Sequence, residues 1–303
     1  MHNTPLTRCV GALETMIRPL RNGALILLLF ASCEESGTVP SYLELSKFTV
    51  ATDPVSEGAN TSNIPISWVY VNDQLLGVWE SASEVPVIPN GEVNVKLRAG
   101  VHRNGVSSEP VQYPFYQLLS LGTQLTPDRG TPVQAVFRYQ PDLDIWHAPF
   151  DDVDMPFTFD VASDTVLLHR DSTVYAFDTQ DGYGDAAAFF LDADHPKMRA
   201  VSFENVDLEA IGTCWLELDY RTDVRLLVGM YYTSGGLVQD EPYVYIAPSK
   251  RDDGGMPWKK IYIDLTPFTA QNTSDRKFYI SAQLEGGATA AQGWIDNVKI
   301  VRP

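Results

Sequence analysis

Residues 293–301 read GWIDNVKIV, and this short stretch decides how the second half of the chain is interpreted. Neighbouring side chains of an extended strand point to opposite faces. Trp294, Asp296 and Val298 therefore share one face, and Ile295 and Val301 share the other. If the first face points to the core, Asp296 is a buried carboxylate, which is costly unless it is paired or bound. The sequence leaves both orientations open.

Several segments before this stretch predict further strands, because their apolar residues recur at every second position. WKKIYIDLTPF (258–268), KFYISAQLEGG (277–287) and VDLEAIGTCWLELDYRTD (206–223) supply these alternating residues: Ile261, Ile263, Leu265; Phe278, Ile280, Ala282, Leu284; and Leu216, Leu218, Tyr220. With PFDD (149–152) and DGYGDAAAFFLDAD (181–194), they resemble a galactose-binding-like jelly roll, the fold of many carbohydrate-binding modules. The resemblance covers residues 148–303 and implies a β-sandwich.

The first half of the chain predicts a smaller sandwich over residues 42–139. VNVKLRAGV (93–101) alternates strictly between apolar and polar residues, as in a half-buried strand. ISWVYVNDQLLGVWE (66–80) predicts two strands joined by a turn at Asn72 and Asp73. The spacing of strands and turns is typical of an Ig-like or transthyretin-like sandwich, and VYVNDQLLG with PVIPNGEVNVKLRAG resembles PEGA-like modules. Residues 140–147 are expected to be a linker, and the whole chain is expected to be all-β.

The N-terminus predicts export from the cytoplasm. Residues 1–32 carry arginines before a short apolar run, the layout of a secretory signal peptide, and Met16 could open a complete signal by itself. Phe30-Ala31-Ser32-Cys33 resembles a bacterial lipobox, which implies cleavage before Cys33 and acylation of its sulfur. Glu34 and Glu35 resemble the surface-export signal of Bacteroidota lipoproteins. The expectation is an outer-membrane protein, lipid-anchored on the cell-surface side through a tether at residues 33–41.

The amino-acid composition limits the classes of partner that the protein is expected to bind. The chain has 39 acidic and 22 basic residues and a net charge of −17, which disfavours binding to nucleic acid. After removal of Cys9 with the signal and acylation of Cys33, Cys214 stands alone, so no intrachain disulfide is expected. Its neighbours Trp215 and Leu216 predict a buried structural thiol.

No catalytic residue is assigned, and the protein is not expected to be an enzyme. The sequence has no G-x-S-x-G elbow and no phosphate-binding glycine loop. No histidine lies at metal-ligand spacing from a cysteine or from a second histidine: His2, His102, His147, His169, His195. Adjacent acids such as Asp252 and Asp253 are interpreted as solvated loop residues.

Three groups of residues are candidates for binding or modification. The jelly-roll resemblance implies a structural Ca²⁺ site at Asp151, Asp152, Asp181 and Asp296, while backbone N–H groups capping the carboxylate are the alternative. Tyr231, Tyr232, Tyr243 and Tyr245 flank the loop TSGGLVQDEP (233–242) and are candidates for contact with a ligand or partner. Thr165 and Ser172 lie in short motifs that resemble the O-glycosylation site of Bacteroidota.

Three functions remain open, and one of them is an adhesin or surface structural protein. The order of anchor, small sandwich and jelly roll resembles stand-alone lipoproteins of Bacteroidota, and the tether reaches at most about 30 Å. This favours a non-catalytic subunit of an outer-membrane β-barrel complex, with the outer-membrane protein insertion machinery as the leading case and other lipoproteins as further partners. The alternative is a surface glycan-binding lipoprotein of a nutrient-uptake system.

Overall fold

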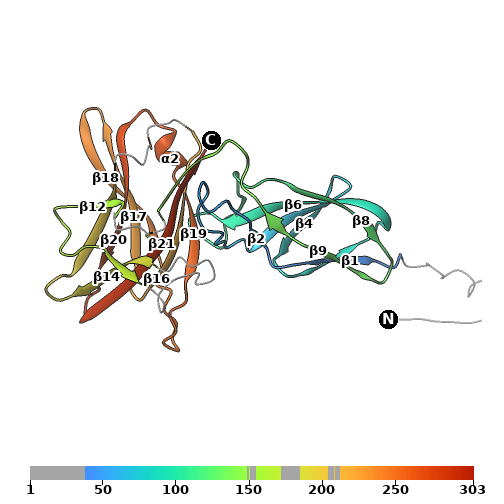
Figure 1. Cartoon of the computed structure of the whole chain (residues 1–303), viewed down its shortest axis with the longest axis horizontal. Helices are drawn as coiled ribbons and strands as arrows, with labels where there is room; N and C mark the ends of the chain where they lie inside the picture. Colours follow the sequence, from blue (N-terminus) through green and yellow to red (C-terminus); the bar gives the residue numbers. More distant parts are fainter. Residues whose placement is uncertain (1–37, 149, 151–154, 172–184, 204–207, 209–211) are drawn as a thin grey trace, which may run out of the picture. The chain divides into compact units, whose positions relative to one another are not determined.

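A computed structural model describes residues 38–148, 150, 155–171, 185–203, 208 and 212–303. Residues 40–303 form one compact unit. Strands are the dominant secondary structure of its described residues and helix is rare (Figure 1), which confirms the all-β prediction. No helix among the described residues is long and apolar enough to cross a membrane.

The first half of the unit is a small sandwich. Its strands are β1 Ser41–Leu45, β2 Thr49–Val50, β3 Ile66–Val71, β4 Gln74–Glu80, β5 Glu84–Val87, β6 Gly91–His102, β7 Pro110–Gln112, β8 Leu119–Leu125, β9 Gly130–Val133 and β10 Val136–Phe137. They form the sheets β5-β1-β9, β10-β2 and β4-β3-β6-β7, with β8 also paired to β6. The apolar residues of β6 are buried as its alternation predicts, and Asn72 and Asp73 make the predicted turn with φ of 48° and 66°.

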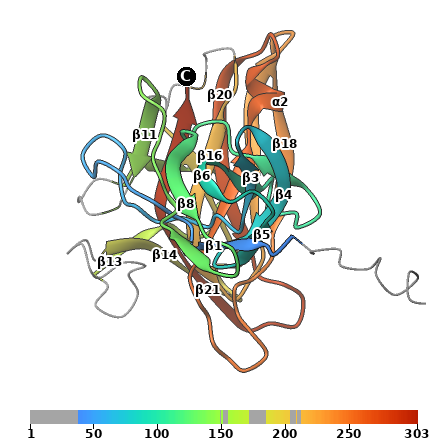
Figure 2. The ribbon, with the colours of Figure 1, turned by 90° about the vertical axis from the view of Figure 1, so that its right-hand side faces the viewer.

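The second half is a jelly-roll sandwich, as predicted. Its elements are β11 Asp144–Ala148, β12 Phe157–Phe159, β13 Leu168–Asp171, β14 Asp185–Asp192, β15 Lys197–Ser202, β16 Trp215–Thr222, β17 Leu226–Ser234, β18 Leu237–Ile246, β19 Lys259–Asp264, α2 Thr266–Thr269, β20 Ser274–Gln283 and β21 Ala290–Arg302. One sheet has the order β13-β14-β21-β16-β19 with β11 on β21, and the other has the order β12-β15-β20-β17-β18. Their inner faces enclose one apolar core. Figure 2 shows α2 and the C-terminal end of β21 at the same end of this sandwich.

A β-bulge in β21 settles the orientation of Asp296. The pairing of β21 with β16 shifts between Asp219 and Glu217, and Asn297 adopts a φ of 48° at this point. The extra residue of a bulge shifts the alternation by one, so even-numbered residues face inward on one side of the bulge and odd-numbered residues on the other. Ile295 therefore points into the core before the bulge, and Val298 and Ile300 do so after it. The orientation with Ile295 inward therefore holds before the bulge, and the orientation with Val298 inward holds after it.

The jelly roll begins within the expected linker and contacts the small sandwich directly. Residues 144–147, expected as part of the linker, instead lie in β11, which extends the first jelly-roll sheet by pairing with β21. The core of the small sandwich continues onto Trp215, Tyr262 and Val301 of the jelly roll. Arg103 at the end of β6 also makes a bridge with Tyr262 of β19.

Candidate functional site

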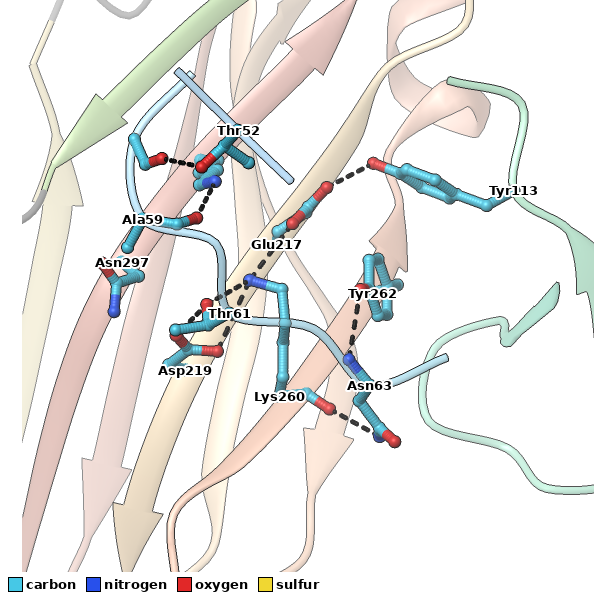
Figure 3. Close-up of polar contacts among 12 residues, drawn as sticks. Thr52, Ala59, Thr61, Asn63, Tyr113, Glu217, Asp219, Lys260, Tyr262 and Asn297 are labelled. Atoms are coloured by element: carbon cyan, nitrogen blue, oxygen red, sulfur yellow. Dashed lines mark hydrogen bonds and ion pairs between the residues drawn. The ribbon is translucent and has the colours of Figure 1, made fainter. Parts of the chain in front are cut away.

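The junction between the sandwiches contains a buried cluster of charges (Figure 3). Glu217 and Asp219 project from the face of β16 opposite the jelly-roll core, and Lys260 projects from the neighbouring β19. Lys260 Nζ lies 3.1 Å from Glu217 Oε2 and 3.4 Å from Asp219 Oδ1, with all three side chains at most 1% exposed. Thr61 of the small sandwich completes the group, because its hydroxyl donates to Asp219 Oδ2 at 2.6 Å and accepts from Lys260 at 3.2 Å.

Two tyrosines of the small sandwich bind the carboxylate of Glu217. The hydroxyls of Tyr113 and Tyr139 both donate to Glu217 Oε1, at 2.8 Å and 2.7 Å. Burial raises the pKa of both phenols, and the charge of Glu217 raises it further. For Glu217 itself, burial opposes ionisation, but Lys260, Lys299 and the two hydroxyls outweigh it and lower the pKa. Glu217 is therefore an ionised acceptor inside the junction.

Lys299 is the second cation of this cluster and is held differently. Its Nζ donates to the carbonyl of Ala59 at 2.6 Å and lies 5.4 Å from the centre of the Tyr139 ring. Burial lowers its pKa to about 8, against the opposing pull of Glu217. For Lys260, attraction to Asp219 and Glu217 outweighs burial and raises the pKa. Since these charges are paired and closed off from solvent, we interpret the cluster as a structural joint.

One set of groups available to a ligand lies on the outer face of the β12-β15-β20-β17-β18 sheet. The registers align Arg199, Ser281, Leu227 and Tyr245 in one row across β15, β20, β17 and β18. Tyr245 ends this row and is 62% exposed. A depression of about 500 Å³ lies over the row, lined by residues that include Lys197, Arg199, Arg225, Tyr245, Gln283 and Glu285. We call this depression the groove.

A fixed polar layer borders the groove. Tyr279 lies over Gly229, where an added Cβ would approach its ring to 2.2 Å, and its hydroxyl donates to Asp240 at 2.8 Å. The Arg199 guanidinium covers this ring at 4.3 Å and donates to Asp240 Oδ2 at 2.8 Å. These contacts hold the guanidinium in place beside the groove, although the side chain of Arg199 keeps 12% exposure.

Tyr231 extends the polar layer towards β12. It accepts a hydrogen bond from Arg199 and donates one to Asp160 Oδ2, both at 2.5 Å. The bond from Tyr231 and one from the backbone of Ala162 lower the pKa of Asp160. Both acids of the layer, Asp160 and Asp240, are thus occupied by neighbouring donors.

The four tyrosines predicted as one contact surface separate into two pairs. Tyr231 and Tyr245 lie on the outer face, whereas Tyr232 and Tyr243 pack on Phe268 of α2. The pairing of β17 and β18 shifts after Val228, which leaves Tyr243 between two paired residues and turns it from the outer face. Its hydroxyl donates to the Asp264 carbonyl at 2.9 Å. Of the four, only Tyr245 offers an exposed ring.

The remaining predicted site residues are only partly described. Asp296 is 5% exposed, and one of its oxygens accepts the Asn297 N–H at 2.6 Å. Its predicted calcium partners Asp151, Asp152 and Asp181 lie outside the described residues, as do Cys33, Glu34, Glu35 and Ser172. Within the described ranges, no group of three His, Cys, Asp or Glu side chains is placed to hold a metal. Thr165 is half-buried beside β15.

Cys214 is a buried free thiol, as predicted. Burial raises its pKa to about 12. A thiol with such a pKa is a poor nucleophile at neutral pH.

Comparison with known proteins gives low similarity only. No protein-family model matches the sequence, and no curated protein matches it. Among solved structures, the K2 cleaved adhesin domain of Lys-gingipain is 12% identical, with a TM-score of 0.33 over 52% of this chain and 98% of that one. CBM27-1 of Caldicellulosiruptor saccharolyticus, solved with mannohexaose, is 10% identical, with a TM-score of 0.34 over 52% and 96%.

TmCBM61, solved with β-1,4-galactotriose, is a further match at 14% identity and a TM-score of 0.29, over 54% of this chain and 90% of that one. TM-scores near 0.3 carry no argument about what this chain binds. Its function has to be inferred from its own groove.

Proposed function

We propose that this protein is a non-catalytic glycan-binding lipoprotein whose jelly roll holds sugars in the groove. The single observation that carries the proposal is the exposed ring of Tyr245, in one cross-strand row with the immobilised guanidinium of Arg199. Ligand sites combine apolar or aromatic surface with a few precisely placed polar groups. The groove supplies both kinds of surface, with Arg199 at one end of the row and Tyr245 at the other.

Sugar chemistry fits this combination. A pyranose has one face rich in C–H groups and an edge rich in hydroxyls, so it can stack on a ring while exchanging hydrogen bonds. Tyr245 supplies the ring, while Lys197, Arg199 and Gln283 supply donors along the groove. Because the polar layer holds Arg199 in place, little side-chain entropy is lost when a hydroxyl binds to it.

The location of the protein is part of the proposal. The lipobox-like segment ending at Cys33, followed by Glu34 and Glu35, supports anchoring by acyl chains on the cell-surface side of an outer membrane. A binding module there would meet glycans outside the cell. Metabolic labelling with an alkyne fatty acid, compared between the native chain and Cys33→Ser, tests the anchor directly.

A glycan array followed by calorimetry tests the binding site. The chain from Glu34 is suitable, since residues 40–303 are one compact unit. We expect the array to retain at least one glycan. Tyr245→Ala should weaken binding of this glycan at least about tenfold. A tenfold loss lies within the ~1–3 kcal/mol that aromatic rings contribute when they stack on nucleic-acid bases. Tyr70→Ala, in β3 of the small sandwich and outside the lining of the groove, is the control. A protein that binds no glycan, or a Tyr245→Ala variant that binds normally, contradicts the proposal.

The subunit hypothesis from the sequence stays a prediction. Affinity purification of the native lipoprotein from detergent-solubilised membranes would recover a β-barrel protein in near-stoichiometric amount if that hypothesis is correct. A protein that also fails on the array would then be a subunit without sugar-binding activity.

A further inference from the structure

A second depression lies at the junction of the two sandwiches and shares a wall with the groove. It measures about 550 Å³ and is lined from the jelly roll by Tyr220, Tyr245, Trp258 and Lys259, among others. The small sandwich lines it with six residues: Ser62, Asn63, His102, Asn104, Gly105 and Val106. Tyr245 lines both this depression and the groove.

We propose that the glycan site continues from the groove past Tyr245 into this second depression, so that the small sandwich forms one wall of the site and the ligand is an extended oligosaccharide. This inference rests on the proposed function and deepens it. It assigns a binding role to the small sandwich, which otherwise has only a structural one.

The wall formed by the small sandwich is firmly fixed. Asn104 in its loop accepts the N–H of Asp264 at 2.9 Å through Oδ1 and donates to the hydroxyl of Tyr243 at 3.3 Å through Nδ2. Its own N–H donates to the Tyr262 carbonyl at 2.9 Å. Asn104 and Gly105 take φ of 55° and 72°, a tight turn that these two residue types accept most readily. The loop is therefore bonded to β19 on one side of the depression.

The buried charge cluster fixes the same junction from within. Lys260 contributes to the lining of the second depression while its ammonium group is paired inside the cluster. A wall that needs no ordering on binding loses less entropy than a mobile loop. The second depression is thus preformed, and it shares Tyr245 with the groove.

The chemistry of the second depression repeats that of the groove. Aromatic residues line it alongside the polar side chains of Ser62, His102 and Lys259. Both volumes lie within the ~300–1,000 Å³ typical of small-molecule sites, so a short oligosaccharide can occupy the groove alone. A longer chain that reaches both gains the second contact intramolecularly, an advantage of up to about 10²–10⁴ in affinity.

The test compares Val106→Arg with Val78→Arg. Val106 is 42% exposed and lines the second depression, whereas Val78 is 47% exposed on β4, outside the lining of either depression. An arginine at position 106 fills the depression without removing a core residue. The probe is a ladder of oligomers, from dimer to octamer, of the array glycan that is retained most strongly, titrated by calorimetry.

We expect affinity to rise at least about tenfold once the oligomer outgrows the groove, and Val106→Arg should abolish this rise while leaving dimers and trimers unaffected. Val78→Arg should keep the rise. If long oligomers bind no better than short ones, or Val106→Arg keeps the rise, the second depression is not part of the site and the groove stands alone. If Tyr245→Ala leaves every oligomer unaffected, the groove itself is refuted.

Discussion

Replacing Lys260 by methionine tests whether the buried charges hold the two sandwiches together. The substitution keeps an unbranched side chain one atom shorter but leaves Glu217 and Asp219 without the ammonium group that lies 3.1 Å and 3.4 Å from them. Removing one partner of a buried ion pair costs about 3–5 kcal/mol, because the remaining charge stays desolvated. At roughly 2–4 °C per kcal/mol for a domain of this size, the midpoint of thermal unfolding should fall by about 6–20 °C.

Lys259→Met is the matched control, because this neighbour on β19 is exposed. We would compare free energies of unfolding from urea titrations with midpoints from calorimetry on the chain from Glu34. Lys259→Met should change stability by less than about 0.5 kcal/mol, as surface substitutions usually do. A Lys260→Met variant within about 1 kcal/mol of the native chain would show that the junction does not depend on this pairing. The interpretation of the cluster as a joint would then be wrong.

Three further predictions follow from individual side chains. Lys299→Met should destabilise the protein less than Lys260→Met. Burial lowers the Lys299 pKa to about 8, below its ordinary 10.5, so the unfolded chain binds more protons than the native chain between these two pH values. In urea titrations, the stability of the native chain relative to this variant should therefore rise from pH 8 to pH 10. Cys214 should resist alkylation by iodoacetamide at pH 8 until denaturant is added, since its pKa is about 12; rapid labelling of the folded chain would contradict its burial. Gly229→Ala should cost about 1–3 kcal/mol and weaken glycan binding, because the new methyl group would displace Tyr279; unchanged tyrosine fluorescence and stability would count against this.

The sequence predicts what depends on local periodicity. Side-chain direction along a strand predicts the alternation in β6 and the inward residues of β16. Turn-forming residue types predict the turn at Asn72 and Asp73. The structure confirms all three. The orientation of β21 could not be predicted as a whole, because one inserted residue reverses it. Asn297 is compatible with positive φ, but only pairing with β16 shows that it takes this conformation.

The buried charges and the groove depend on contacts between distant segments. Glu217 and Asp219 alternate with the core residues of β16, so the sequence alone places them on the solvent side. They are buried because Thr61, Tyr113 and Tyr139 cover them from the other sandwich. The groove likewise joins Arg199 with Tyr245, which the registers bring into one row. No periodicity along the chain contains this information.

The joint also has a mechanical consequence. Its hydrogen bonds connect residues 59–63, Tyr113 and Tyr139 to β16, β19 and β21 at several separate points. A pull on a sugar held in the groove would therefore be resisted by several of these bonds, which belong to three different strands of the jelly roll. Residues 40–303 would transmit such a load as one unit, from the bound glycan to β1, which begins at Ser41.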